Sequence, residues 1–294
     1  MGASIITGCG QVGRQLCDLL AVQNKTITCL VKTQASRDLL TQRGFTAKTF
    51  DLDTRPTLPE DLPLAQSDLY YFIPPSNTDL IDHRIDYFLE LCKTHIPRRI
   101  VYISTSGVYG DCNGEWVNEA HPASPVTERA KRRYYAELSL IQFCKEFQCQ
   151  FNILRVGGIY GPERLPLERL KTVTVVCPEE APYSNRIHAY DLASACLAAM
   201  HCDTHGEIIN VADGHPTSMT DYFYQLADMA ELPHPPCVPL SQAEEKLSPG
   251  MLSFINESRR LSIDKMQSVL KIALKFPTLE QGLKDCFKSK AKDL

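Results

Sequence analysis

Short apolar runs alternate with helical apolar stripes along the first two thirds of the chain. Each run is long enough for one buried strand, and the stretches between runs repeat apolar residues at helical spacing, as in Ile81, Ile85, Phe88, Leu89 and Cys92. Strands that alternate with helices in this way indicate an α/β fold with a doubly wound parallel sheet. The strands that the pattern predicts span residues 4–7, 26–31, 45–50, 69–73, 99–103 and 151–156.

The last third of the chain has a different pattern. Residues 165–183 are poorly periodic, and from Gly214 onward Pro-rich connections join shorter helices, which we predict at Thr220–Leu232 and Asp264–Leu270. These segments predict a smaller C-terminal domain on the substrate side of the sheet. The predicted division gives 1–164, 186–213 and 252–265 to the larger domain and 165–185, 214–251 and 266–294 to the smaller one.

A glycine-rich turn follows the first predicted strand and opens the first predicted helix. Gly8, Gly10 and Gly13 form the G-x-G-x-x-G pattern, which is typical of a Rossmann fold that binds a dinucleotide. Gly8 permits the tight turn, Gly10 lets the backbone approach a pyrophosphate, and Gly13 permits close packing of the helix on the strand. The alternative is an ordinary turn with incidental glycines. The candidate cofactor residues here are Gly8, Gly10, Gln11, Val12 and Gly13.

The end of the second predicted strand bears on the choice of cofactor. In this fold an acidic residue there accepts hydrogen bonds from the ribose of NAD, whereas a basic residue suits the extra phosphate of NADP. Lys32 ends the strand, Arg37 follows, and the next carboxylate is Asp38, so the sequence favours NADP with NAD as the alternative. Both basic residues could instead be solvated surface charges. Asp51 is placed to meet the adenine edge, and Pro74 ends the fourth strand where a loop should cover the cofactor.

Charge and cysteine content narrow the class of protein. The 294 residues carry a net charge of -4, so the chain lacks the excess of positive charge that favours binding to nucleic acid or an anionic membrane. No apolar run approaches the length of a membrane span. The twelve cysteines form no C-x-x-C pair, so we expect reduced buried thiols, a cytoplasmic protein and no metal site. We expect the partner to be a small-molecule substrate and the protein to be a monomer or homodimer.

Four motifs occur in an order that resembles the extended short-chain dehydrogenases/reductases, which include nucleotide-sugar epimerases and dehydratases. The motifs are Thr7–Gly13, Ser104–Asp111, Leu154–Pro162 and Arg186–Ala193. The resemblance implies that Thr105 occupies the position of the catalytic Ser or Thr of that superfamily. It also implies that the loop carrying Tyr160 runs beneath the nicotinamide, although Tyr160 could instead be a packed aromatic residue.

One motif of that superfamily, the Y-x-x-x-K pair, is replaced in this chain. The matching stretch places Arg129 where the Tyr should be and Arg133 where the Lys should be, and none of the twelve tyrosines has a Lys four residues later. The chain therefore resembles the atypical YeeZ-like subgroup, which is described as NAD-dependent epimerase/dehydratase. We expect Arg133 to contact the cofactor and Arg129 to receive a substrate anion.

Three functions remain open from the sequence. The first is an NAD(P)-dependent oxidoreductase that acts on a small polar substrate. The second is a nucleotide-sugar epimerase or dehydratase, which would need another acid or base such as Tyr109, Tyr160 or His188. The third is a dinucleotide sensor without catalysis, which the missing Tyr/Lys pair favours.

Overall fold

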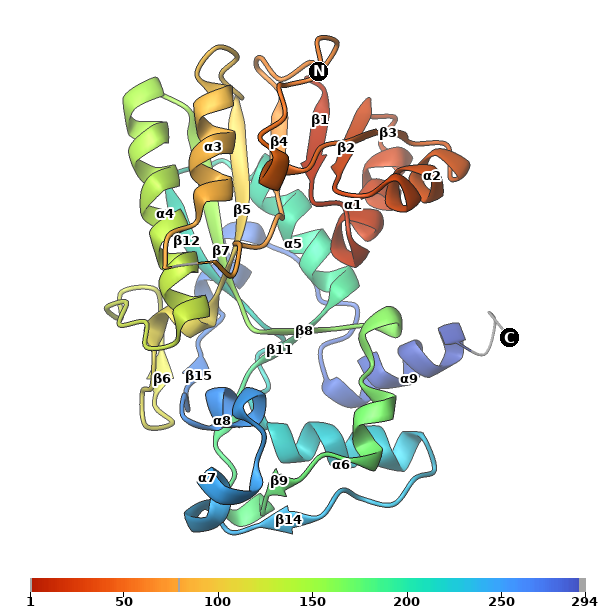
Figure 1. Ribbon diagram of the computed structural model, residues 1–294, viewed down its shortest axis with the longest axis vertical. Coiled ribbons are helices and arrows are strands. Elements are labelled where there is room, and N and C mark those ends of the chain that lie inside the picture. Colours follow the sequence, from red (N-terminus) through yellow and green to blue (C-terminus); the bar gives the residue numbers. More distant parts are fainter. Residues whose placement is uncertain (1, 79, 291–294) are drawn as a thin grey trace.

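A seven-stranded parallel sheet forms the centre of the larger lobe (Figure 1). The computed structural model describes residues 2–78 and 80–290. The strand order is β12-β7-β5-β4-β1-β2-β3, and every pairing in the sheet is parallel, so the predicted α/β doubly wound Rossmann sheet is confirmed. The strands are β1 (Ser4–Thr7), β2 (Ile27–Val31), β3 (Thr46–Thr49), β4 (Asp68–Tyr71), β5 (Arg99–Thr105), β7 (Gln150–Val156) and β12 (Glu207–Val211).

Helices cover both faces of this sheet. On one face α1 and α5 pack against each other and α2 lies beside them, while α3 and α4 cover the other face. The helical stripe at Ile85, Phe88, Leu89 and Cys92 is buried, which confirms that it belongs to the core. The bounds are α1 (Gln11–Val22), α2 (Gln34–Gln42), α3 (His83–Cys92), α4 (Glu128–Phe147) and α5 (Ala189–His201).

A separate hydrophobic cluster forms the smaller lobe, in the lower half of Figure 1. In this lobe, a capping box between Ser218 and Asp221 fixes the start of helix α6. Its elements are β9 (Val175–Val176), α6 (Met219–Met229), β14 (Cys237–Val238), α7 (Ala243–Lys246), α8 (Pro249–Ile255) and α9 (Leu279–Lys290).

The predicted domain division stays a proposal, which the packing refines at one boundary. Met266 and Leu270, in a π-helical turn where we predicted a helix, pack into the cluster that contains α1 and α5. We therefore propose that the last segment of the smaller domain starts after Leu270. Residue 1 and residues 291–294, which the predicted domains include, lie outside the described part of the chain.

Several short strand pairs lie outside the seven-stranded sheet. Strands β8 (Gly158–Tyr160) and β11 (Arg186–His188) pair between the sheet and the smaller lobe. Strand β6 (Trp116–Val117) pairs with β15 (Arg260–Leu261), and β10 (Tyr183–Ser184) pairs with β13 (Thr217–Ser218). None of the described helices is long and apolar enough to cross a membrane.

Candidate functional site

The glycine loop leaves open space at the N-terminus of α1. Gly8 has φ +75°, and a Cβ there would lie 2.8 Å from the backbone N of Ile73. A Cβ on Gly10 would instead meet nothing nearer than 4.0 Å. Helix α1 begins at Gln11 without a side-chain cap and without an acidic residue in its first turn. The free backbone N–H groups therefore face open space where an anion can bind.

Two contacts connect the glycine-loop helix with the loop after β8. The Gln11 amide lies against Gly161, and its Oε1 atom has no hydrogen-bond partner among the described residues. Arg14 forms an ion pair with Glu163. The sequence analysis did not identify Arg14, because its partner lies 149 residues further along the chain. These contacts hold the two loops together beside the open space.

Charged groups at the ends of β2 and β3 are already paired with one another. Lys32 Nζ lies 2.6 Å from a carboxylate oxygen of Asp53 and 3.5 Å from one of Asp51. Arg84 donates to both oxygens of Asp53 at 2.7 Å and to the Pro74 carbonyl at 2.8 Å. The hydrogen bonds from Arg84 and Lys32 hold the pKa of Asp53 well below its usual range. The sequence analysis missed Asp53 and Arg84 as members of this cluster.

Arg37 lies on α2 and also has a carboxylate neighbour. Its guanidinium is 3.4 Å from Asp38, and both side chains are largely exposed. Each basic residue that suggested NADP, Lys32 and Arg37, thus has an acidic partner in this structure.

A cavity of about 480 Å³ opens beside the carboxyl end of β5 and extends to α6. It brings together the four predicted catalytic residues, Thr105, Arg129, Arg133 and Tyr160. Glu257 is the one carboxylate among the residues lining it. The lining arginines are Arg129, Arg133, Arg164, Arg169, Arg186 and Arg259. This composition makes the cavity suited to an anionic ligand.

Thr105 and Glu257 approach the same backbone position. A Cβ on Gly107 would be 3.5 Å from Thr105 Oγ1 and 3.6 Å from Glu257 Oε2. Thr105 Oγ1 accepts a hydrogen bond from the Gly107 N–H, and Arg259 donates to Glu257 Oε2 at 3.2 Å. The other oxygen of Glu257, Oε1, is buried without a partner among the described residues. The sequence analysis missed Glu257, which is more than 150 positions from Thr105 in the sequence.

Arg129 and Arg133 lie on α4 and point to different neighbours. Arg133 donates to the Ile103 carbonyl at 3.0 Å and to the Tyr102 hydroxyl at 3.2 Å, at the end of β5. The Arg129 guanidinium stacks over the Phe254 ring at 5.0 Å, on the side of the smaller lobe. Both residues line the cavity.

Arg186 is a buried cation that lines the cavity. Arg186 is 6% exposed, and its guanidinium lies 4.0 Å from the centre of the Tyr222 ring. Its polar contacts are Met219 Sδ at 2.9 Å and Ser184 Oγ at 3.4 Å, while its Nε atom has no partner among the described residues. No described carboxylate forms an ion pair with it, and burial lowers its pKa. Such a group is costly to bury unless a ligand compensates the charge.

Tyr160 packs as a buried aromatic residue. Its hydroxyl donates to the Thr278 carbonyl at 3.5 Å and lies against Gly282, and its ring packs edge-on against His188 and Tyr222. Burial raises the pKa of Tyr160 above its usual range. The ring lines the cavity, but this geometry directs the hydroxyl toward α9.

The other two candidate proton donors, His188 and Tyr109, already form hydrogen bonds within the protein. His188 caps α5 by accepting a hydrogen bond from the Tyr190 N–H, and burial lowers its pKa to about 4. The Tyr109 hydroxyl donates to Asn210 Oδ1 at 2.7 Å. Neither residue is among those that line the cavity.

A buried ion pair lies under the end of β5. Arg155 Nη2 and Glu137 Oε2 are 2.8 Å apart, with both side chains at most 5% exposed. Ser104 donates a further hydrogen bond to Glu137. These groups satisfy one another and therefore support the sheet beneath the cavity.

The fold and the glycine loop define a Rossmann-type protein. Residues 77–212 match the model of the NAD dependent epimerase/dehydratase family, which confirms the predicted resemblance over this segment. The match starts after the glycine loop and includes Thr105, Arg129, Arg133 and Tyr160.

Curated relatives match parts of the chain. Protein YeeZ of Escherichia coli is 28% identical over 176 residues, which are 60% of this chain and 60% of that protein. The dTDP-D-glucose 4,6-dehydratase of Homo sapiens is 22% identical over 140 residues, which are 45% of this chain and 40% of the human protein. The matches therefore span between two fifths and three fifths of these relatives' lengths.

Solved structures match nearly the whole chain. A conserved protein of unknown function from Silicibacter pomeroyi has a TM-score of 0.81 at 26% identity, over 98% of this chain and 99% of that one. UDP-glucose 4-epimerase from Thermotoga maritima, with UDP-glucose, has a TM-score of 0.81 at 18% identity, over 99% of both chains. UDP-glucuronic acid 4-epimerase from Bacillus cereus, with UDP-glucuronic acid and NAD, has a TM-score of 0.76 at 20% identity, over 99% of this chain and 100% of that one. The two epimerases share the fold of this chain.

Proposed function

We propose that this chain is an NAD-dependent enzyme of the epimerase/dehydratase type that acts on a nucleotide sugar. The observation that carries the proposal is the arginine-lined cavity, which meets Thr105 at the end of β5. A nucleotide sugar carries a diphosphate, which arginines bind well. The family match and the nucleotide sugars bound by the two similar epimerases support this function over an oxidoreductase acting on a small polar molecule.

The residues of the larger lobe fit NAD. The open face of Gly10 and the uncapped start of α1 suit a pyrophosphate, and Asp51, which caps the turn Leu52–Thr54, is proposed to meet the adenine edge. Because Lys32 is paired with Asp53, we propose NAD rather than the NADP that the sequence favours. Arg133, at the end of β5, is proposed to contact the ribose. When bound, NAD supplies the acceptor and donor of the hydride.

The proposed proton acceptor is Glu257, with Thr105 as the residue that holds the substrate oxygen. Both side chains lie against Gly107, so one substrate hydroxyl can contact both. The proton moves from that hydroxyl to Oε2 of Glu257, the carboxylate oxygen that lies next to Gly107 and Thr105. The role assigned to Tyr in the superfamily thus passes to a carboxylate, while Arg129 and Arg186 bind substrate anions. Tyr160 is proposed to shape the cavity through its ring rather than to transfer a proton.

The test is an assay of epimerisation and dehydration with a panel of UDP- and dTDP-linked sugars in the presence of NAD. We expect turnover by the native protein, and we expect Glu257→Gln to lower kcat by about 10²–10⁴-fold because it removes the proton acceptor. Glu244→Gln, on the outside of α7, is the matched control and should retain native kcat. NAD affinity, measured by calorimetry, should be the same in all three proteins.

One result would replace this proposal by the sensor function. Tight NAD binding without turnover of any nucleotide sugar would mean that the cavity recognises a ligand without transforming it. The replacement of the Tyr/Lys pair by Arg129 and Arg133 is the observation that favours this second candidate.

A further inference from the structure

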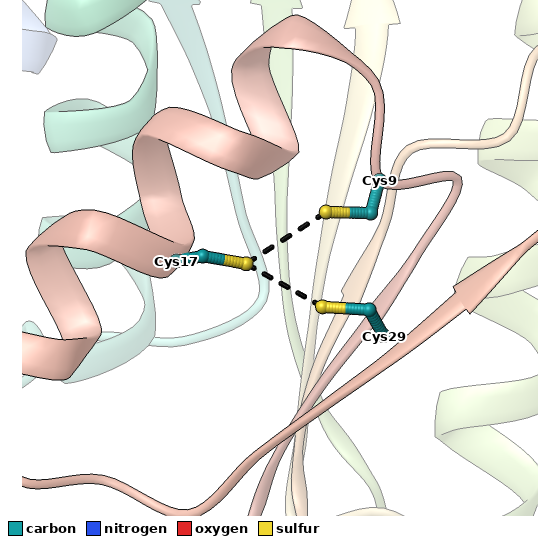
Figure 2. Close-up of side chains that lie close together, drawn as sticks. All are labelled: Cys9, Cys17 and Cys29. Atoms are coloured by element: carbon teal, nitrogen blue, oxygen red, sulfur yellow. Dashed lines mark hydrogen bonds between the residues drawn. The ribbon is translucent and has the colours of Figure 1, made fainter. Parts of the chain in front are cut away.

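Three thiols converge beside the glycine loop (Figure 2). Cys9 comes from the loop, Cys17 from α1 and Cys29 from β2. Cys17 Sγ lies 3.7 Å from Cys9 Sγ and 3.4 Å from Cys29 Sγ, and all three sulfurs lie within 4.8 Å of one another. Within residues 2–78 and 80–290 this is the one group of three or more Cys, His, Asp or Glu ligands that close together.

The surroundings of the three thiols are apolar. Cys17 and Cys29 are fully buried and Cys9 is 3% exposed, within the same core cluster as Ile6 and Val12. The hydrogen bond with Cys17, together with burial, raises the pKa of Cys29 above its usual range. The thiols are therefore neutral when no ion is bound, and they pack as small apolar groups.

We propose that Cys9, Cys17 and Cys29 form a binding site for a soft monovalent metal ion of the Cu(I) class. Thiolate sulfur is the ligand that such ions prefer. A structural zinc site normally needs four ligands, and no described His, Asp or Glu joins the three sulfurs. Three sulfurs suit an ion that accepts a lower coordination number.

Binding exchanges protons for the ion without any change of oxidation state. Metal–sulfur bonds form, S–H bonds break, and one proton passes to solvent for each thiolate that forms. Affinity therefore rises with pH. Cys9 is the least buried of the three thiols and precedes the exposed Gly10, so the loop is the proposed route of entry.

The site would act directly on the glycine turn. A Cβ on Gly13 would lie 3.0 Å from Cys9 Sγ, so the sulfur of Cys9 already occupies the space beside this glycine. An ion that fixes Cys9 to Cys17 also fixes the turn between β1 and α1. The site itself does not depend on the proposed enzyme function, since its residues lie outside the cavity.

The test is anaerobic titration of the full chain with Cu(I), in competition with a chromophoric Cu(I) chelator and without any dinucleotide. The other nine cysteines can also bind copper, so the comparison is with Cys17→Ala, which removes the central sulfur. Cys196→Ala, at a buried thiol of α5 outside the group, is the matched control. We expect Cys17→Ala to bind one ion fewer than the native protein and Cys196→Ala to bind the native number.

A melting experiment gives a second readout. Cu(I) should raise Tm in the native protein and in Cys196→Ala, and this shift should be lost in Cys17→Ala and in Cys9→Ala. Cys9→Ala, in the loop, is the substitute if Cys17→Ala does not fold by circular dichroism. If Cys17→Ala and Cys9→Ala bind as many copper ions as the native protein, the proposed metal site is wrong. Zn²⁺ binding with the same dependence on Cys17 would overturn the assignment to a soft monovalent ion.

Discussion

The end of β2 and the cavity differ in how their charged side chains are paired. At the end of β2, Lys32 and Arg84 share the carboxylate of Asp53, and Lys32 also lies 3.5 Å from Asp51, so two cations are balanced by two acids within the protein. In the cavity, Arg186 stacks on the ring of Tyr222 and Arg169 on the ring of Phe223. Neither arginine forms an ion pair with a carboxylate among the described residues.

Three acidic residues close to the cavity arginines already form ion pairs, one of them with a cavity arginine. Glu163 pairs with Arg14, Glu168 lies 2.9 Å from Lys171, and Glu257 pairs with Arg259. The positive charge of Arg164, Arg169 and Arg186 therefore remains available to a ligand. We propose that the charges near β2 support the structure, whereas Arg164, Arg169 and Arg186 bind the ligand.

The largest effect is expected at the glycine loop. Gly10→Asp places a carboxylate in the open space beside the N-terminus of α1, where it repels a pyrophosphate and competes for the same N–H groups. Hydrogen bonds to charged groups contribute about 1.5–3 kcal/mol each, so NAD affinity should fall at least about a hundredfold. Calorimetry measures this loss. Gly250→Asp, in open space on α8, adds the same charge as a control and should keep native affinity.

The next effect concerns a buried arginine that does have a partner. Arg155→Met leaves Glu137 buried without its counter-ion, which should lower the free energy of unfolding by about 3–5 kcal/mol. Urea denaturation measures the change. The double variant Glu137→Gln/Arg155→Met should recover much of the stability. If Arg155→Met is as stable as the native protein, the ion pair with Glu137 does not stabilise the fold, and the proposed difference between Arg155 and Arg186 is wrong.

Arg186→Met tests a buried arginine that has no carboxylate partner among the described residues. Removing a buried cation without a partner should leave the free energy of unfolding unchanged or raise it, because the desolvation cost disappears. Affinity for UDP-sugars should fall roughly ten- to a hundredfold, since a charge-assisted hydrogen bond is lost. Denaturation and ligand titration on the same variant separate the two effects. A large loss of stability would show that Arg186 has a structural role instead.

The smallest effect is expected for Lys32→Ala. Its side chain is 58% exposed and paired with Asp53, so the change should alter NADH and NADPH affinity by less than about fivefold, in line with a surface pair worth at most about 1 kcal/mol. Titration with both dinucleotides measures the preference. A selective loss of NADPH affinity would restore the NADP assignment that the sequence favours.

The sequence by itself determined the fold and the glycine loop, because both depend on local patterns. Apolar runs at strand length and helical stripes predicted six strands of the sheet to within about two residues at their ends, as with residues 45–50 for β3. The positive φ of Gly8 and the close contact of Gly13 follow from a short motif in which each glycine has a steric reason. The segment Ser104–Asp111 likewise placed Thr105 at the end of β5.

The tertiary structure alone decided which charges and thiols meet. Lys32 and Asp53 are 21 residues apart, and nothing in the local sequence shows that they pair. Glu257 reaches Thr105 only because the chain returns to β6 through β15. Cys9, Cys17 and Cys29 lack a metal-binding spacing, yet parallel β1 and β2 and the helix between them bring their sulfurs together. Such contacts depend on how distant elements pack, which the local pattern of apolar and polar residues does not encode.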